Sequence, residues 1–341
     1  MIVAPPAAPE ATELIPERVR NRLRELGYPL PEPGELLRLA LVGQTTYFHQ
    51  CALEEPSAWA SPAFFDFRSG ADAHAMVERV RAFDPHVVLV FRPELIPARA
   101  FNGLHALTLG WLTEPLPRGS ETDPHPDLVR RLEYLRGADR GNFDRIVCFD
   151  PLVIPAASAI LPVWRSVPLP VADSLYVDEI ATDPGVRPLF IGRSTPHREW
   201  MLEMSKHKTD LLHVGHGTSL EDLRELLRGT TIGVNLHNEA YPSFENRVAI
   251  LMAAGRLVVS EPLSPTHGLE PGIDYIEATN PWELYKGIWS VRHYPEAWEL
   301  MRLRGRVKAE LFRASRVYPR LLANTFHDVA VFGSERPRPA S

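Results

Sequence analysis

The sequence predicts an α/β protein built from two Rossmann-like domains, each with a parallel sheet, that face a cleft. Short apolar segments alternate with amphipathic ones along most of the 341 residues, as expected where strands and helices alternate. The segment 86–91 is apolar throughout, which is typical of a strand covered on both faces. A loop-like, acidic stretch at 168–188 interrupts the alternation and separates two similar halves.

The first half contains six expected strands. An amphipathic helix at 16–27 ends at Gly27 and precedes the first strand. The strands are expected at 37–42, 64–67, 86–91, 105–112, 144–149 and 163–167, and the later helices at 71–83, 126–135 and 156–161. Residues 1–13 are rich in proline and alanine, and we expect them to form a disordered tail.

The second half contains four expected strands. They are expected at 188–192, 210–214, 231–236 and 256–260, with helices at 197–205, 219–227, 244–254, 282–291 and 296–316. Ser219 and Asp222 have the spacing of a capping box. We expect the last two helices to pack back over the first domain. The predicted division is therefore 14–173, 174–316 and a segment, 317–341, that returns to the first domain and ends in a mobile tail.

The most informative stretch is 241–261. Pro242 and Ser243 are a stop-and-cap signal, so we expect Ser243 to cap a helix that begins at Phe244. Gly255 suits the left-handed position that ends a helix. The helix is apolar on nearly all sides, which predicts deep burial. Its N-terminus is a natural anion site, because unpaired amides and the helix dipole attract negative charge.

Two charged residues lie in the first turn of this helix. Arg247 favours phosphate, whereas Glu245 repels phosphate unless its side chain reaches elsewhere, for example to a sugar hydroxyl. The alternative is that Glu245 only starts the helix and that Arg247 is an ordinary surface cation. Residue types do not decide between these interpretations.

Composition limits the class of protein. A net charge of −6 argues against a general nucleic-acid binder. The two cysteines, Cys51 and Cys148, form neither a disulfide framework nor a zinc-binding pattern, which favours a reducing cytoplasm. No apolar run has the length of a membrane span, and the N-terminus lacks the features of a secretory signal. We therefore expect a cytoplasmic protein.

Polar residues follow several expected strands. Ligands of parallel sheets bind outside the carboxyl ends of the strands, so the loops after Val42, Leu112, Ile191, Val214 and Leu236 are expected to face the cleft. Arg193 and Arg198, with the helix end at Ser243, form a plausible diphosphate site. The alternative is that Arg193 pairs with a loop carboxylate and Arg198 with Glu199 or Glu203.

Histidines add possible ligand contacts. His213 and His216 suggest a metal pair, but one lies in a strand and the other in a loop, with no third ligand at a telling spacing. We predict no metal site. His216, Gly217 and His237 are instead expected to contact a ligand, with a solvated polar loop as the alternative.

The first half offers candidates for a general base. His49 and Glu114 each lie in a loop at the carboxyl end of a strand, while Asp66 lies inside a strand and is more typical of a structural residue. Gln44 and Tyr47 share the loop of His49 and are expected to contact an acceptor. The signatures of dinucleotide dehydrogenases, P-loop NTPases and α/β-hydrolases are absent.

Residues 187–290 resemble the C-terminal half of a GT-B glycosyltransferase, and most closely the branch with family-4-like and spore-maturation-type enzymes. The resemblance rests on Phe190 to Arg193 with Arg198, on Ser243 to Gly255, and on Leu257 to Glu261. In relatives the sequence of the middle segment follows the pattern R-x-F-E-x-x-A-x-G. Over residues 37–173 the resemblance is architectural only.

The resemblance implies a glycosyltransferase, such as a hexosyltransferase, with a nucleotide-sugar donor, a hydroxyl acceptor and no cofactor or essential metal. The acceptor is a glycan, a lipid-linked glycan, a protein or a small molecule. The first domain then lies on the acceptor side and the second binds the donor. In relatives an Arg and a Lys five residues later hold the donor diphosphate; Arg193 matches the first and Arg198 replaces the second. The donor-binding candidates are Arg193, Arg198, His216, Gly217, His237, Ser243, Phe244, Glu245, Asn246 and Arg247.

One departure from the family pattern motivates two alternatives. The two glutamates of the relatives fall at Pro242 and Ile250, and the nearby Glu245 is a possible substitute for the one that holds the ribose. A non-catalytic GT-B-like protein that binds a sugar or a partner, and a nucleotide-sugar epimerase of the same architecture, therefore remain open.

Overall fold

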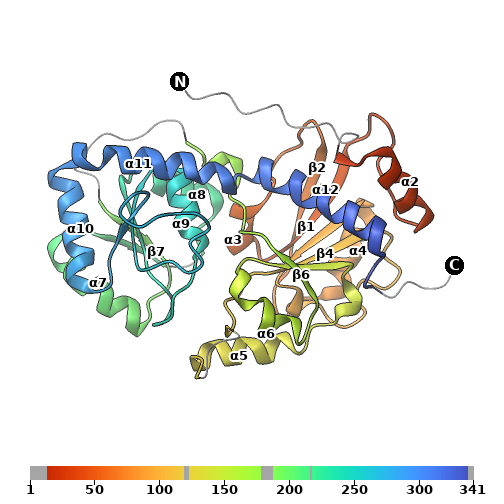
Figure 1. Cartoon of the computed structure of the whole chain (residues 1–341), viewed down its shortest axis with the longest axis horizontal. Coiled ribbons are helices and arrows are strands. Elements are labelled where there is room, and N and C mark those ends of the chain that lie inside the picture. Colours follow the sequence, from red (N-terminus) through yellow and green to blue (C-terminus); the bar gives the residue numbers. More distant parts are fainter. Residues whose placement is uncertain (1–13, 119–122, 178–186, 216, 337–341) are drawn as a thin grey trace. The chain divides into compact units, whose positions relative to one another are not determined.

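The chain forms two compact units in the computed structural model (Figure 1), which describes residues 14–118, 123–177, 187–215 and 217–336. The first unit comprises Met1–Leu169 and Ala314–Ser341, and the second comprises Pro170–Arg313. The division falls a few residues before the predicted boundaries at 173 and 316. The predicted tail at 1–13 lies outside the described residues.

The first unit contains a six-stranded parallel sheet, as predicted. Its order is β2-β1-β3-β4-β5-β6. The strands are β1 (Leu37–Gly43), β2 (Ala60–Asp66), β3 (Val87–Phe91), β4 (Leu107–Leu112), β5 (Arg145–Cys148) and β6 (Val163–Ser166). The edge strand β2 begins four residues before its predicted start, because its pairing with β1 begins at Ala60 opposite Leu37. Pro62 is tolerated there because an edge strand has one unpaired side.

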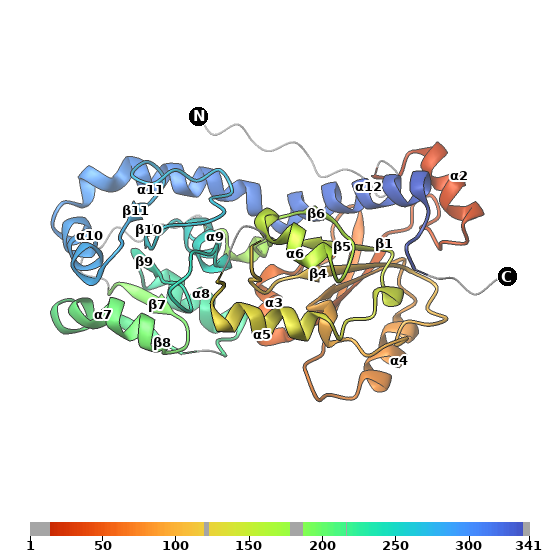
Figure 2. The ribbon, with the colours of Figure 1, turned by 60° about the horizontal axis from the view of Figure 1, so that its bottom comes forward.

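Six helices belong to the described part of the first unit. They are α2 (Glu17–Glu25), α3 (Thr45–Phe48), α4 (Ala73–Phe83), α5 (Pro126–Leu135), α6 (Ile154–Ser158) and α12 (Ala314–Phe332). Helix α12 was predicted only as a returning segment. Its apolar face, including Tyr318 and Phe326, joins the core formed with Leu23 of α2 and Trp111 of β4. Helix α12 therefore completes this core, and Figure 2 shows it beside α2.

The second unit contains a five-stranded parallel sheet of order β11-β10-β9-β7-β8. The strands are β7 (Leu189–Ile191), β8 (Leu212–Val214), β9 (Ile232–Asn235), β10 (Leu257–Ser260) and β11 (Ile276–Glu277). The helices are α7 (Pro196–Lys208), α8 (Leu220–Arg228), α9 (Asn246–Ala253), α10 (Pro281–His293) and α11 (Pro295–Ala309). Strand β11 was not predicted, because two residues carry no periodic signal.

The prediction that the helices at 282–291 and 296–316 cover the first domain is wrong. Helix α10 packs on α7 and β10, and α11 packs on α9 and β10, all within the second unit. The predicted helix 296–316 is in fact divided. It ends at Ala309 and a short 3-10 turn, Glu310–Phe312, leads to α12.

When the strands of each unit are counted along the chain, the first five lie in the order 2-1-3-4-5 in both sheets. This order places the candidate site. In the second sheet β7 lies between β8 and β9, so the connections leaving β7 and β9 depart in opposite directions. Such a switch point at the carboxyl edge of a parallel sheet is where ligands bind. A ligand of this unit is therefore expected at the loops after β7 and β9.

Helix α9 begins two residues later than predicted. Glu245 holds the N-cap position, and no side chain caps the helix there. The predicted cap, Ser243, is engaged elsewhere, in hydrogen bonds with His237 and Glu245. The predicted end of the helix is confirmed, because Gly255 has φ +72° and Arg256 N donates to Leu251 O.

Candidate functional site

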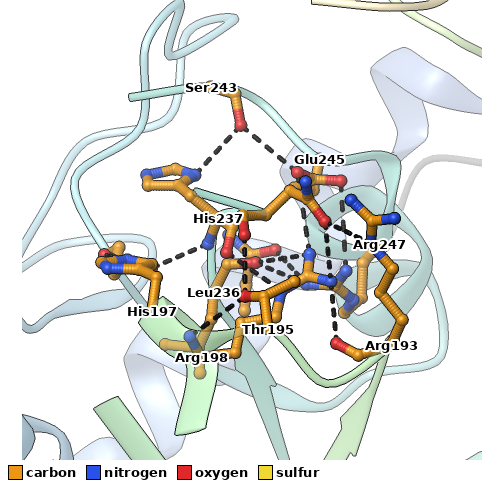
Figure 3. A network of polar contacts seen from close by, with 12 residues as sticks. Arg193, Thr195, His197, Arg198, Leu236, His237, Ser243, Glu245 and Arg247 are labelled. Atoms are coloured by element: carbon orange, nitrogen blue, oxygen red, sulfur yellow. Dashed lines mark hydrogen bonds and ion pairs between the residues drawn. The ribbon is translucent and has the colours of Figure 1, made fainter. Parts of the chain in front are cut away.

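The loops after β7 and β9 are joined by Thr195. Its hydroxyl caps α7 by accepting from Arg198 N, and it donates to Asn238 O at 2.8 Å. This one side chain therefore fixes the start of α7 against the loop that follows β9. Three arginines, Arg193, Arg198 and Arg247, converge at this junction, and we call them the arginine cluster (Figure 3).

Arg198 is the most deeply buried member, with 2% of the residue exposed. Its guanidinium donates to His237 O at 2.9 Å, to Leu236 O at 3.1 Å and to Arg193 O at 3.2 Å. Burial lowers its pKa. The carboxylate partners considered as an alternative, Glu199 and Glu203, are not its partners. Arg198 instead organises the backbone of both loops.

Arg247 reaches the same backbone from α9. One terminal nitrogen donates to Asn235 Oδ1 at 2.9 Å and to Leu236 O at 3.1 Å. Leu236 O thus accepts from both Arg198 and Arg247. The side chain is 13% exposed, and burial together with the charge of Arg198 lowers the pKa of Arg247 to about 10. It remains cationic at neutral pH.

A single aromatic ring supports both guanidinium groups. The Cζ atoms of Arg198 and Arg247 lie 5.4 and 5.0 Å from the centroid of the Phe190 ring. Rings attract cations through their electron-rich faces, which offsets part of the repulsion between the two arginines. Gly192 permits this arrangement, because a Cβ atom there would lie 3.2 Å from Arg198 and 3.3 Å from Arg247.

Arg193 and Glu245 complete the charge distribution. Arg193 is exposed, and its Nε donates to Asn238 Oδ1 at 2.9 Å. Glu245 lies 3.9 Å from Arg198 and 4.0 Å from Arg247. Within the described residues it is the carboxylate that approaches these guanidinium groups to 4.0 Å or less. Glu261 and Glu239 act on Arg198 from farther away, so the immediate surroundings of the arginine cluster have more positive than negative charge.

His237 forms part of the frame of this site. Its Nε2 lies 2.9 Å from Pro262 O, which can only accept, so this nitrogen is protonated. Burial lowers the pKa of His237, so the ring is neutral and Nδ1 accepts from the Ser243 hydroxyl at 3.0 Å. Both ring nitrogens and Ser243 Oγ are thus used in internal contacts. Direct ligand binding by His237 and Ser243 stays a prediction.

Glu261 is a functional candidate that the sequence reasoning missed. It directly follows β10, is 6% exposed, and accepts from His237 N at 2.7 Å. Its second oxygen lies 2.8 Å from Nε2 of His197. A carboxylate directly after a buried strand is a signal that was available in the sequence. Glu261 thus links His197 of α7 to the loop after β9 through the backbone N of His237.

The other predicted residues of this half are not all gathered at the arginine cluster. Phe244 packs in an aromatic group with His267 and Phe312, at ring distances of 4.6 and 5.7 Å. Asn246 donates to Pro170 O at 3.4 Å. Gly217 has φ +96°. His216 lies outside the described residues, which contain no cluster of three potential metal ligands.

In the first unit, His49 and its neighbours follow β1. The His49 ring lies edge-on against Phe64, with centroids 5.3 Å apart. Gln44 donates to Thr46, and Tyr47 is 38% exposed. Asp66 accepts from Thr45 N and Oγ1, both at 2.8 Å, which agrees with the structural role that we favoured for it.

Glu114 belongs to an ion-pair network at the carboxyl edge of the first sheet. One oxygen lies 3.2 Å from Arg92, and the other accepts from Arg131. Arg131 also pairs with Asp127, and Arg92 with the buried Glu94. Both carboxylate oxygens of Glu114 are thus occupied by guanidinium groups within the unit. The network therefore favours His49 over Glu114 as the general-base candidate.

Comparison with known proteins gives no match to a protein-family model and none to a curated protein sequence. Solved structures do match. HepE of Anabaena, in complex with UDP and glucose, has a TM-score of 0.56 at 9% identity, over 85% of this chain and 99% of that one.

Two further glycosyltransferases match over a similar range. One, from Rickettsia africae, has a TM-score of 0.51 at 10% identity, over 88% of this chain and 100% of that one. AviGT4, of avilamycin A biosynthesis, has a TM-score of 0.51 at 13% identity, over 87% and 98%. At such identities the likeness shows the fold alone. The chain therefore has the α/β fold of the GT-B glycosyltransferases, with two parallel sheets, as the sequence predicts.

Proposed function

We propose that the chain transfers a glycosyl group from a nucleoside-diphosphate sugar to a hydroxyl acceptor, without a metal ion. The observation that carries the proposal is the arginine cluster, whose excess positive charge lies at the switch point of the second sheet. When the bond between the anomeric carbon and the diphosphate oxygen breaks, that oxygen keeps the bonding electrons. Fixed cations stabilise the resulting charge without the need for a metal.

The three arginines have different parts in this proposal. Arg193 and Arg247 contact the diphosphate, because in the described part of the chain the two terminal nitrogens of Arg193 and one of Arg247 have no hydrogen bond. The guanidinium of Arg198 donates to backbone carbonyls instead, and this holds the loops after β7 and β9 in position. This differs from the direct diphosphate contact that the family resemblance implies for Arg198.

The acceptor hydroxyl loses its proton as its oxygen bonds to the anomeric carbon. We propose His49 as the base that takes this proton, with Gln44 and Tyr47 as acceptor contacts. Glu114 is the weaker candidate because of its ion pairs. In the test, His49→Ala lowers the rate of transfer while it leaves the affinity for the nucleoside diphosphate unchanged, and Glu114→Gln has the smaller effect on transfer.

A non-catalytic role in binding a sugar or a partner is the second candidate. The relatives' ribose-binding glutamate corresponds to Ile250, which is 4% exposed within the second core and has no group that binds a hydroxyl. Pro242 stands at the other glutamate position. Such a protein would bind a nucleotide sugar without consuming it.

Calorimetric titration tests the proposal directly. UDP is the first probe, since HepE binds UDP in solved structures, and GDP, TDP, ADP and CMP follow. We expect one diphosphate to bind with the same affinity in magnesium and in EDTA. Binding of none of them, or binding only with magnesium, contradicts the proposal.

A second measurement separates transfer from binding alone. The matching nucleotide sugar is incubated with a panel of hydroxyl acceptors, and release of the nucleoside diphosphate is followed. Arg193→Met is the informative variant, because Arg193 is exposed and we expect the fold to tolerate its loss. We expect it to weaken binding by at least about tenfold, the loss of one charged contact. If the nucleotide sugar binds but no acceptor of the panel causes release of the nucleoside diphosphate, the result supports the non-catalytic role.

A further inference from the structure

A small recess lies at the carboxyl edge of the first sheet, between the loops after β3 and β4 and helix α5. Its cavity has a volume of about 20 Å³, and its lining includes Arg92, Glu94, Thr113, Glu114, Arg131 and Tyr134. One water molecule needs about 10–15 Å³ of such space, so the cavity takes a single water or a group of that size. Strands β3 and β4 are the first and second neighbours of β1, whose loop contains His49. The recess therefore shares a sheet edge with the proposed base.

The charged residues of the recess are all paired with one another. Arg92 Nε donates at 2.7 Å to Glu94, whose side chain is 6% exposed, and Arg92 Nη1 lies 3.2 Å from Glu114. Glu114 also accepts from Arg131. Asp127, which pairs with Arg131 as well, is balanced by a second arginine of α5. Three arginines thus face three carboxylates, so a phosphate or an ammonium group placed here would meet charges of its own sign.

Hydrogen-bonding groups remain unused in this balanced wall. Thr113 Oγ1 is buried and has no hydrogen-bond partner in the described part of the chain. Nη2 of Arg92 makes no hydrogen bond within the same residues. A buried polar group without a partner is costly, and an alcohol group both donates and accepts. A neutral hydroxyl of the size of one water therefore fits the recess in volume, in charge and in hydrogen bonding.

Arg92 has a backbone conformation that supports a functional role for the recess. Its φ of +65° and ψ of +65° lie in the left-handed region, which glycine and asparagine adopt more readily than arginine. Such residues are held by their surroundings and cluster at functional sites. Here Arg92 N donates to Trp111 O at 3.1 Å, and the short 3-10 turn Pro93–Leu95 brings Glu94 within reach of the guanidinium.

The remaining lining of the recess is apolar and includes an exposed ring. Leu116 and Leu135 are buried, whereas Tyr134 is 65% exposed. A tyrosine ring has an apolar body, and here it accompanies a polar wall. A sugar ring has the matching division, because its C–H groups lie on the ring faces and its hydroxyl groups project from the rim. The lining thus suits a carbohydrate better than a lone alcohol group.

We propose that the recess binds one hydroxyl group of a neutral carbohydrate, and that this carbohydrate is the acceptor. Another hydroxyl of the same molecule is then presented to His49 for transfer. The assignment as acceptor rests on the proposed function, whereas binding of the carbohydrate requires no turnover. The described residues contain no helix with the length and apolar character needed to cross a membrane.

Saturation-transfer difference NMR of the full chain tests this without any donor. The probes are a panel of neutral mono- and disaccharides that includes glucose, with glucose 6-phosphate and glucosamine as its charged counterparts. We expect at least one neutral sugar to bind, and the variant Thr113→Val to weaken this binding. If no neutral sugar binds in a way that depends on Thr113, or if a charged counterpart binds more tightly in that way, the proposal is overturned.

Matched variants locate the site. Thr113→Val keeps the shape of the side chain and removes a hydroxyl without an internal partner, so we expect the fold to be retained. Sugar binding should fall about three- to tenfold, the effect of one hydrogen bond. Tyr134→Ala should also lower it. Tyr294→Ala is the control, since Tyr294 is 51% exposed in the second unit, and an equal loss there overturns the assignment.

The failure of this inference differs from the failure of the proposed function. Transfer to a lipid or peptide hydroxyl, without sugar binding that depends on Thr113, overturns the carbohydrate site and leaves glycosyl transfer intact. Sugar binding that depends on Thr113, without transfer to any acceptor, supports the carbohydrate site and contradicts the proposed transfer.

Discussion

The carboxylate of Glu245 lies 3.9 Å from a guanidinium nitrogen of Arg198, at the edge of the arginine cluster. Glu245 acts here as the counter-ion of two buried arginines, and a bound diphosphate would meet its negative charge. We therefore expect Glu245→Gln to strengthen the binding of UDP, or of whichever diphosphate binds, by about three- to tenfold. Isothermal titration at neutral pH measures this change.

Glu239→Gln is the control for Glu245→Gln. It removes the same charge from the loop after β9, and Glu239 has the weaker influence on Arg198. We expect a smaller effect on affinity. If Glu245→Gln instead weakens binding, its carboxylate contacts the ligand, for example through a ribose hydroxyl.

Arg198→Met should destabilise the protein. The substitution keeps an apolar stem but removes the side-chain donor to the buried carbonyl of His237, and it leaves Arg247 as the donor to Leu236 O. We expect a loss of about 2–4 kcal/mol in the free energy of unfolding. Urea denaturation measures it. Arg193→Met, with the same chemical change at an exposed position, should cost less than about 1 kcal/mol. Equal costs would rule out the positioning role of Arg198.

Gly192→Ala should disturb the arginine cluster more than the fold. Its Cβ atom would lie 3.0 Å from the Phe190 ring and within 3.3 Å of both buried guanidinium groups. We expect at least about tenfold weaker diphosphate binding, since the long arginine side chains must move. Gly215→Ala, after the neighbouring strand β8, meets no atom within 4 Å and is the matched control. Unchanged affinity in Gly192→Ala would show that the guanidinium positions do not matter.

His86 should make stability depend on pH. Its Nδ1 accepts from Arg38 N at 2.9 Å, and burial lowers its pKa from 6.5 to about 4. The unfolded chain therefore binds this proton more readily than the folded one between those values. The contribution of neutral His86 to the free energy of unfolding is complete above about pH 6.5 and is lost as the pH falls toward 4. Its total is on the order of 1–3 kcal/mol.

The variant His86→Asn isolates this effect, because its amide oxygen can still accept from Arg38 N and does not titrate. Urea unfolding between pH 4 and 7 gives the slope of stability against pH for both proteins. We expect a flatter slope in the variant. The same slope in both would assign the pH dependence to other groups.

The sequence predicted the sheets better than it predicted the site. Strands such as β3 and β4 are buried on both faces, so their apolar runs are unambiguous. Helix α5 has its predicted bounds, with a proline at its first position. Helix α12 was missed beyond residue 316, and Pro319 within it is a helix-breaking signal that tertiary packing overrides.

The site depended on contacts that no local pattern contains. Ser243 has the residue type of a cap, but His237 and Glu245 compete for its hydroxyl. The charge of Arg198 predicts an exposed side chain that contacts a ligand. In the structure its guanidinium instead donates to the backbone carbonyls of Leu236 and His237, in a loop about forty residues later. Local spacing identifies which residues lie at the carboxyl edge of the sheet. It does not reveal which of them face one another.

The return of the chain through α12 has a consequence for the order of folding during synthesis. The core of the first unit needs Tyr318, Leu322 and Phe326, which the ribosome adds after the whole second unit. The second unit is continuous from Pro170 to Arg313 and has its own cores. The half of the protein that is made first is therefore the last to be finished, and a chain released before α12 would expose the apolar surface that this helix covers.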